Sequence, residues 1–260
     1  MRPVVLSIAG LDPGGGAGIV ADIKAIEAHR CWAAAVATTL TVQTVGRVDA
    51  AHEVPPEILV AQIGAVFSDH PVAAVKVGLL GGAATVDAVA NALRGRGLPV
   101  VLDPVCCATS GARFLDDAAR DRLRGALLPL VDVVTPNRDE VLWLAGLPPE
   151  AEIEAAAEAL LEDGARHVLV TGASAANGVY EDRLFSRQGI QAIEHREVAT
   201  DRIHGTGCLH SSSLAAQLAR GASVSDAARE AARWMERALE DAVAFGDGGS
   251  PDAAAPVGVA

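Results

Sequence analysis

The chain has 260 residues, with 33 acidic and 21 basic side chains and a formal net charge of −12. This balance argues against a general nucleic-acid-binding protein, which needs a basic surface to displace counterions. The mean hydropathy is +0.29, yet charged residues interrupt the most apolar stretches before they reach the ~18 residues of a membrane span. These are Lys24, Lys76, Asp87 and Arg94. We therefore expect a soluble protein with no membrane partner.

The N-terminus and the cysteines indicate the compartment. Asp12-Pro13-Gly14 ends the first apolar run too early for a secretory signal. The four cysteines show neither the paired spacing of a disulfide scaffold nor a CxxC zinc motif. We expect reduced thiols and a cytoplasmic protein.

Short β-branched runs alternate with longer amphipathic segments along the chain. Strands are expected at 3–9, 36–42, 73–77, 99–102, 131–135 and 167–171, with two or three more within 178–198. Helices are expected at 16–29, 56–67, 85–93, 116–127, 139–145, 153–163, 206–219 and 225–243.

This alternation predicts the fold class. Entirely apolar strands such as Val100-Val101-Leu102 are typical of a sheet covered on both faces. We expect a three-layer α/β fold, a mostly parallel central sheet flanked by helices on both faces. No Pro/Gly/Ser-rich linker interrupts residues 1–245, which predicts a single domain over that range. Residues 246–260 carry little that could be buried, and we expect a disordered tail there.

A glycine-rich segment, Asp12-Pro13-Gly14-Gly15-Gly16-Ala17-Gly18, lies between the first strand and the first helix. Glycines let a ligand approach the backbone, and the helix start beyond them favours an anion or a polar group. The Walker pattern requires Lys-Ser/Thr where Ile19-Val20 stands, and the dinucleotide pattern requires a third glycine at Ile19. A tight structural turn is the alternative interpretation.

A second segment, His204-Gly205-Thr206-Gly207-Cys208, also precedes a predicted helix. Consecutive amides of small residues at a helix start form a concavity of donors that favours a transferring phosphoryl group. Cys208 lies in the first turn, where the helix dipole lowers a thiol pKa from ~8.5 toward neutrality. This predicts proton removal from a substrate hydroxyl, or binding at the reacting centre. A buried cysteine without such a role is the alternative.

Polar residues follow two of the buried strands. Asn137 and Glu140, in Thr135-Pro136-Asn137-Arg138-Asp139-Glu140, share one helix face, and Asp103 ends another strand. Oxygen ligands of this kind suit magnesium, and the carboxyl ends of sheet strands are where α/β ligands bind. The alternatives are a helix N-cap with a glutamate at its third position and a turn-forming aspartate.

Two further polar residues lie on otherwise apolar elements. Asp22 falls one turn into the first helix, and Gln43 ends Thr38-Thr39-Leu40-Thr41-Val42. Either could hydrogen-bond a small heterocycle, although residue type alone favours a solvated surface position.

In this order and spacing, the motifs resemble those of the ribokinase superfamily. Within it they are most similar to the hydroxymethylpyrimidine/phosphomethylpyrimidine kinases of thiamine biosynthesis. The resemblance covers about residues 3–245. The matching segments are Ile8–Pro13 with Gly15–Gly18, Ala21–Lys24, Thr41–Thr44, Lys76–Leu80, Leu102–Val105 with Ala108–Gly111, Thr135–Asn137 with Glu140, and His204–Cys208. Cys208 discriminates most, because sugar kinases carry aspartate at that place.

The resemblance implies a role for each matching residue and an ATP-dependent phosphoryl transfer. Gly10, Asp22 and Gln43 would hold an aminopyrimidine, with Leu79 against its ring. The magnesium and nucleotide ligands would be Asp103, Asn137 and Glu140. The anion hole would comprise Gly205, Thr206 and Gly207, with Cys208 at the hydroxyl that is phosphorylated. These roles imply Mg²⁺ and ATP as requirements and a homodimer as the assembly.

The sequence departs from the family at several positions. Leu11 stands where serine is usual, Leu79 where methionine is usual, and Thr171 lies in a run that replaces Lys-Gly-Gly-His near the nucleotide. Cys106-Cys107 is also unusual, in a segment expected to close over the substrate. The alternatives are therefore a pyridoxal-type vitamin B6 kinase, which acts on a similar ring, and a non-catalytic pyrimidine-sensing module. The chain lacks the third glycine of the dinucleotide-binding pattern, which argues against a Rossmann oxidoreductase.

Overall fold

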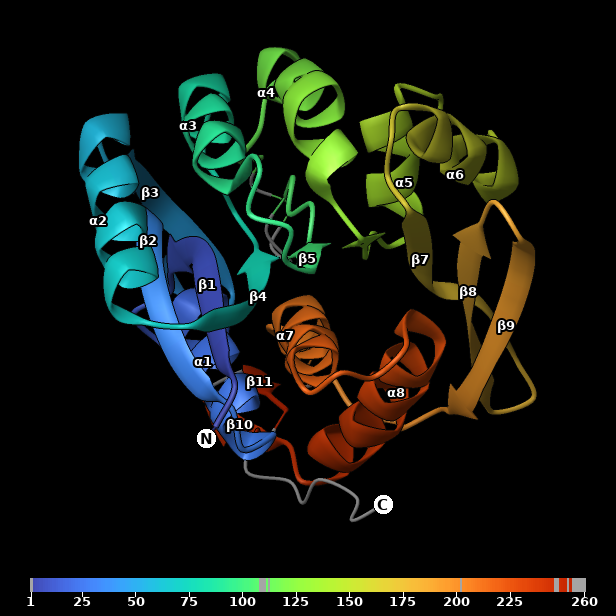
Figure 1. Cartoon of the computed structure of the whole chain (residues 1–260). Coiled ribbons are helices and arrows are strands. Elements are labelled where there is room, and N and C mark those ends of the chain that lie inside the picture. Colours follow the sequence, from blue (N-terminus) through green and yellow to red (C-terminus); the bar gives the residue numbers. More distant parts are fainter. Residues whose placement is uncertain are drawn as a thin grey trace.

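A nine-stranded sheet forms the centre of the molecule, with strand order β3-β2-β1-β4-β5-β6-β7-β8-β9 (Figure 1). The computed structural model describes residues 2–107, 111, 113–201, 203–245, 248–251 and 253. The strands are β1 (Val4–Leu11), β2 (Trp32–Thr44), β3 (Arg47–Glu53), β4 (Val72–Val77), β5 (Val100–Leu102), β6 (Val133–Val134), β7 (His167–Ala176), β8 (Val179–Ser186) and β9 (Gly189–Arg196). The six consecutive strands β2-β1-β4-β5-β6-β7 pair in parallel, whereas β3 pairs antiparallel with β2, β8 with β7 and β9 with β8.

Helices cover both faces of this sheet, which confirms the predicted three-layer α/β architecture (Figure 1). On one face lie α2 (Pro56–Asp69), α3 (Ala83–Leu93), α4 (Asp117–Arg122), α5 (Arg138–Ala145) and α6 (Ile153–Glu162). On the other lie α1 (Gly18–Ala28), α7 (Thr206–Ala219) and α8 (Val224–Glu240). Strands β5 and β6 are entirely apolar because both faces of the sheet are buried there, and β1 and β4 each carry one buried polar side chain, Ser7 and Lys76.

Three elements differ from the expectations. The helix expected at 116–127 is α4 followed by a π-helical turn, Leu123–Leu127. Strand β3 was not expected, because it lies at the edge of the sheet and none of its seven residues is buried, so the sequence shows no apolar face there. A short hairpin pairs β10 (Val243–Phe245) with β11 (Gly248–Ser250).

The hairpin corrects the predicted disordered tail where residues are described. Ser250 and Ala253 are buried, and Ala253 packs with residues of α1 and α8. The composition of this segment predicted disorder because a glycine-rich strand has few side chains to bury, and its stability depends on the residues that pack against it. The remainder of 246–260 lies outside the described residues.

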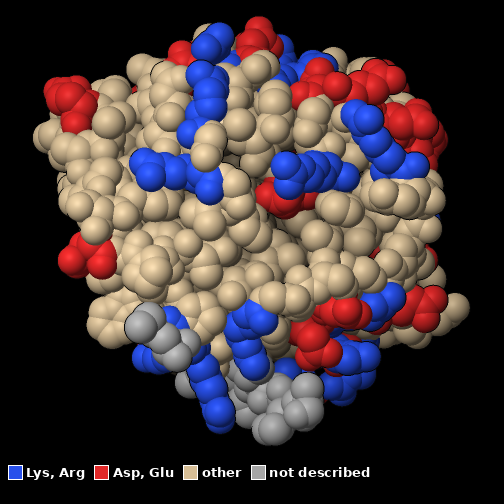
Figure 2. Space-filling view, in the orientation of Figure 1, with Lys and Arg blue, Asp and Glu red and all other residues tan. Residues whose placement is uncertain are grey.

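Charged side chains are distributed without a single-sign stripe on the face that Figure 2 shows, where basic and acidic residues are interspersed. Several form surface ion pairs, such as Arg122 with Asp87. Across the described residues, no helix is long and apolar enough to cross a membrane.

Candidate active site

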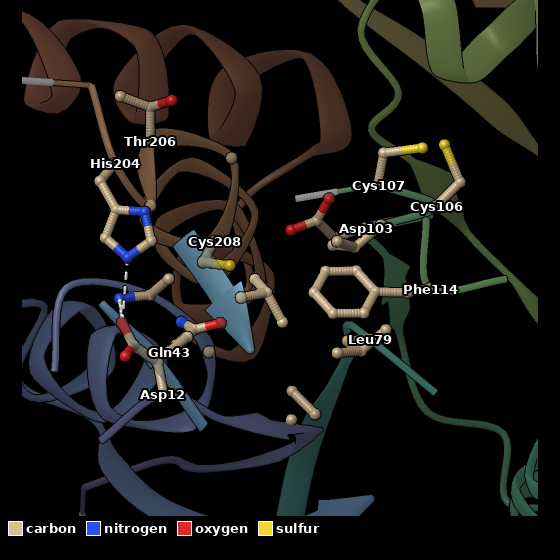
Figure 3. Close-up of a pocket in the computed structure, with 18 of the residues that line it drawn as sticks. Asp12, Gln43, Leu79, Asp103, Cys106, Cys107, Phe114, His204, Thr206 and Cys208 are labelled. Carbon is tan, nitrogen blue, oxygen red and sulfur yellow. Dashed lines mark hydrogen bonds and ion pairs between the residues drawn. The ribbon is translucent and has the colours of Figure 1, made fainter. Parts of the chain in front are cut away.

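A pocket of ≈ 560 Å³ opens where the parallel strands end and where α1 and α7 begin (Figure 3). Its lining includes almost all of the residues that the sequence singled out: Gly10, Gln43, Leu79, Asp103, Asn137, Glu140, Thr171, Gly205, Thr206, Gly207 and Cys208. The predicted site residue that the lining does not include is Asp22. Carboxyl ends of strands and amino ends of helices meet at one edge of such a sheet, so segments far apart in sequence converge here.

The two glycine-rich segments contact each other directly at one end of the pocket. Gly205 has φ +82°, and a Cβ atom there would lie 1.9 Å from the carbonyl oxygen of Gly16. Only glycine fits this position, both for its backbone conformation and for the available space. Ser250 of β11 lies against the same contact, with its Oγ 2.9 Å from the carbonyl oxygen of His204 and 3.2 Å from that of Gly16. The contact therefore links the start of the chain to its end.

Asp12 and His204 connect the same two segments through their side chains. Nε2 of His204 lies 3.0 Å from Oδ2 of Asp12, and the Asp12 carboxylate also accepts the N–H groups of Gly14 and Ala17. Burial alone would raise the pKa of Asp12, but these hydrogen bonds and one from Gln43 lower that pKa to about 2. The sequence interpretation assigned no role to this pair, although both residues belong to the quoted motifs.

Helix α7 presents its first turn to the pocket, as the sequence predicted. Gly205 is its N-cap, so the N–H groups of Gly207 and Cys208 have no acceptor inside the helix. The N–H of Thr206 donates to the carbonyl oxygen of Ile203 at 3.2 Å. The N–H groups at this helix start that face no backbone acceptor are therefore those of Gly207 and Cys208, whereas the N–H of Thr206 is already paired.

The pKa of Cys208 is the clearest correction to the sequence interpretation. Burial raises the pKa of this thiol to about 12, and the charges of Asp103 and Asp22 add to that effect. The charge of Lys76 and the backbone N–H of Gly18 oppose it without overcoming it. The expected shift toward neutrality is wrong, because desolvation of the thiolate outweighs the helix dipole. In the free protein the thiol is protonated at neutral pH.

Asp22 lies beneath the pocket and not in its lining. It is fully buried, and its carboxylate accepts hydrogen bonds from Lys76 Nζ at 2.8 Å, Ser7 Oγ at 2.6 Å and Ser212 Oγ at 2.8 Å. Lys76 is also fully buried, and its Nζ lies 3.9 Å from Oδ2 of Asp103. Burial would lower the pKa of Lys76, but Asp22 and its other acidic neighbours raise it. Asp22 is therefore not placed to contact a pyrimidine in the pocket, contrary to the expectation. It forms a buried ion pair with Lys76 below the pocket instead.

Asn137 and Glu140 lie at the start of α5, whereas Asp103 lies against the start of α7, where a Cβ atom at Gly207 would be 3.8 Å from its carboxylate oxygens. Asn137 and Glu140 form a complete capping box: Asn137 Oδ1 accepts the Glu140 N–H at 2.9 Å, and Glu140 Oε2 accepts the Asn137 N–H at 3.0 Å. The capping interpretation is therefore correct. It does not exclude a binding role, since both residues also line the pocket.

The two carboxylates fit a magnesium ion that is shared with a substrate. Burial and the charge of Asp103 raise the pKa of Glu140 to about 8, and burial raises the pKa of Asp103. A cation between the two carboxylates would favour their charged forms, which burial and mutual repulsion disfavour. No group of three or more potential ligands lies among the described residues, but Mg²⁺ usually takes one or two carboxylates, with waters and substrate phosphates completing its shell.

Thr171 reaches the pocket where β7 passes the start of α5. Its N–H donates to the carbonyl oxygen of Pro136 at 2.9 Å, which places it beside Asn137. The next residue, Gly172, has φ +59° and donates its N–H to the buried Asp182 at 2.7 Å. The segment that departs from the family is thus held by the backbone and by Asp182.

The remaining wall of the pocket suits a flat ring. Gly10 packs so closely on Leu79 that a Cβ atom there would lie 2.9 Å from Leu79 Cδ2. Gln43 lies near Asp12, and the ring of Phe114 stands beside Leu79 (Figure 3). The sequence interpretation missed Phe114, since an isolated aromatic residue in a loop carries no pattern.

Comparison with known proteins decides the family. The sequence profile described as phosphomethylpyrimidine kinase matches residues 12–252. The chain belongs to the phosphomethylpyrimidine kinase family. A hydroxymethylpyrimidine/phosphomethylpyrimidine kinase of Rhizobium meliloti is 39% identical over 256 residues, which cover 96% of each chain.

Solved structures related to this kinase family share the ribokinase-like fold that the resemblance implied. An ADP complex of Bacillus subtilis pyridoxal kinase superposes with a TM-score of 0.88 at 25% identity, covering 98% of each chain. A phosphomethylpyrimidine kinase of Clostridium difficile has a TM-score of 0.78 at 28% identity, covering 92% of this chain and all (100%) of that one.

Proposed function

We propose that this kinase transfers the γ-phosphoryl group of ATP to 4-amino-5-hydroxymethyl-2-methylpyrimidine, and then to its monophosphate, in thiamine biosynthesis. The observation that carries the proposal is the placement of three chemically different groups around one pocket. These are a polar and apolar wall for a ring, a helix start for a phosphoryl group, and a pair of carboxylates. Family membership supports the same reaction.

Each wall of the pocket has a part in this transfer. Gln43 and the backbone at Gly10 bind the aminopyrimidine, and Leu79 and Phe114 contact its ring. The N–H groups of Gly207 and Cys208 donate to the phosphoryl oxygens during transfer. The Cys208 thiol lies next to the hydroxyl, where it donates a hydrogen bond or passes on a proton. Such positioning supplies most of what phosphoryl transfer requires.

Asp103 and Glu140 are the residues that would hold Mg²⁺, with Asn137 and Thr171 toward the nucleotide. Bound magnesium would neutralise negative charge on the phosphates. The two carboxylates would supply its oxygen ligands from the protein.

A pyridoxal-type kinase is the second candidate, and the high TM-score against the Bacillus subtilis enzyme favours it. The experiment that separates the candidates is ADP release with Mg-ATP, run in parallel on hydroxymethylpyrimidine, its monophosphate and pyridoxal. Turnover on both pyrimidines supports the proposal. Preference for pyridoxal would replace it with the B6 reaction. Pyrimidine binding by calorimetry without turnover on any substrate would indicate a sensing module.

We also infer a cytoplasmic homodimer. Large apolar side chains are exposed on β2 and on the neighbouring α2, namely Trp32, Leu40, Val42, Ile58 and Val60. This surface, next to the edge strand β3, would be buried against a second copy. Sedimentation equilibrium tests the inference, and a monomer at micromolar concentration would contradict it.

A further inference from the structure

Two cysteines that are adjacent in sequence both line the pocket. Cys106 is 6% exposed, whereas Cys107 is exposed to solvent. Their side chains end in sulfur atoms that are turned toward each other (Figure 3). Burial is the largest cause that raises the pKa of Cys106 to about 12, followed by the charge of Glu140. The neighbouring Cys107 thiol adds to this shift, as expected for two thiols in contact.

The backbone holds both cysteines in place. The carbonyl oxygen of Cys106 accepts the N–H of Phe114 at 2.8 Å and that of Leu115 at 3.3 Å. Cys107 forms an antiparallel bridge with Arg113. Because both residues are anchored, a ligand that binds the two sulfur atoms would lose little conformational entropy from the chain.

Sequence adjacency disfavours a disulfide between these thiols. Neighbouring Cα atoms across a trans peptide lie about 3.8 Å apart. Disulfides usually require about 4.4–6.8 Å between Cα atoms, and shorter separations store strain that makes the bond easy to reduce. The pair therefore remains a dithiol under reducing conditions.

The composition of this site selects its ligand. Thiol sulfur prefers soft elements over hard cations. Since no cluster of three or more histidine, cysteine or acidic residues lies within the described part of the chain, a four-ligand metal site is not formed. Two adjacent thiols match a soft centre that makes two bonds to sulfur. We propose that Cys106 and Cys107 form a dithiol site for trivalent organic arsenicals in the wall of the substrate pocket.

The reaction with phenylarsine oxide balances without an oxidant. Two As–S bonds form, the arsenic–oxygen bond breaks, and the oxygen leaves as water with the two thiol protons. Arsenic stays trivalent and both sulfur atoms keep their oxidation state. The phenyl group is then held at the pocket wall, where it occupies space needed by the pyrimidine. This last consequence rests on the proposed function.

Intact-protein mass spectrometry of the full chain under native conditions tests the site. One equivalent of phenylarsine oxide is expected to give a single adduct, whose mass gain equals that of phenylarsine oxide minus one water. Cys107→Ser and Cys106→Ser lose the adduct. Cys31→Ser keeps it and is the matched control, because Cys31 is buried in the core with its Sγ 3.6 Å from the carbonyl oxygen of Ala216. An excess of monothiol leaves the adduct intact, whereas 2,3-dimercaptopropanol removes it.

Other outcomes would overturn the proposal. An adduct that survives Cys106→Ser and disappears in Cys208→Ser would assign the second sulfur to Cys208. An adduct that a monothiol removes would show attachment at one thiol only. Circular dichroism checks each variant for folding, and the exposed Cys107→Ser variant decides the matter if Cys106→Ser does not fold.

Kinase activity separates this inference from the proposed function. ADP release should be lost when the adduct forms, and saturating hydroxymethylpyrimidine should slow its formation. Protein that turns over before treatment but forms no adduct with phenylarsine oxide would refute the dithiol site alone. Adduct formation by a chain without turnover on any pyrimidine would refute the proposed function alone.

Discussion

Nε2 of His204 lies 3.0 Å from Oδ2 of Asp12, although 192 positions separate the two residues in the chain. The pair joins the segment that precedes α1 to the segment that precedes α7. Both segments line the pocket, so the contact fixes the position of the glycine-rich segment relative to the start of α7. A displacement of about 1 Å at such a site costs on the order of 10²-fold in rate.

Replacing Asp12 with asparagine should destabilise the fold most near neutral pH. The folded-state pKa of about 2 lies below the ordinary value of 3.8, so the carboxylate stabilises the folded state above pH ~4 and loses this effect as the pH falls toward 2. The loss should be about 2 kcal/mol at pH 6 and should vanish near pH 2. Urea unfolding across this range measures it, and a pH-independent difference would contradict the assignment.

Cys208→Ser should lower kcat by a factor on the order of 10²–10⁴, because a hydroxyl transfers a proton less readily than a thiol at the reacting centre. Affinity for the pyrimidine and ATP, measured by calorimetry, should change little. Cys31→Ser serves as the control. A Cys208→Ser variant with near-normal turnover would show that the N–H groups and magnesium suffice.

Lys76→Met should destabilise the fold by about 3–5 kcal/mol, since it leaves the buried Asp22 carboxylate without its cation. The double variant Lys76→Met/Asp22→Leu should cost less than the sum of the two single changes. Equilibrium unfolding in urea gives the free energies of unfolding that this double-mutant cycle compares. Lys24→Met, at an exposed position of α1, should cost under about 1 kcal/mol. Additive single changes would mean that the pair is not coupled.

Thr171→Lys should lower the KM for ATP by about tenfold, or about 1.4 kcal/mol. Thr171 lines the pocket beside Asn137, where a lysine ammonium group could reach the phosphates. Thr171→Gln adds length without charge and should leave the KM nearly unchanged. Equal KM values for the lysine and glutamine variants would place the nucleotide elsewhere.

Glu140→Gln should raise the Mg²⁺ concentration for half-maximal turnover by about tenfold. Glutamine keeps an acceptor oxygen for the capping bond from Asn137, so the helix start should persist. Glu158→Gln removes the same charge from the exposed face of α6 and should have no effect. ADP release measured over a range of Mg²⁺ concentrations compares the Glu140→Gln and Glu158→Gln variants. No change in Glu140→Gln would remove this carboxylate from the metal site.

The sequence by itself determined the alternation of strands and helices, the buried parallel sheet and the segments that meet at the pocket. Apolar periodicity and glycine spacing are local, so they can be read without knowing what packs against them. The helix start at Thr206 and the capping of α5 by Asn137 follow from the same local chemistry.

Only the tertiary structure decided what surrounds each ionisable group. Asp22 is a helix residue in sequence, but in the fold it meets Lys76 and Ser212 from elements far along the chain. The Cys208 thiol lies at a helix start, yet its burial in the fold, together with the charges of Asp103 and Asp22, raises its pKa. Desolvation depends on every neighbouring atom, whichever segment supplies it, and local sequence does not record those neighbours.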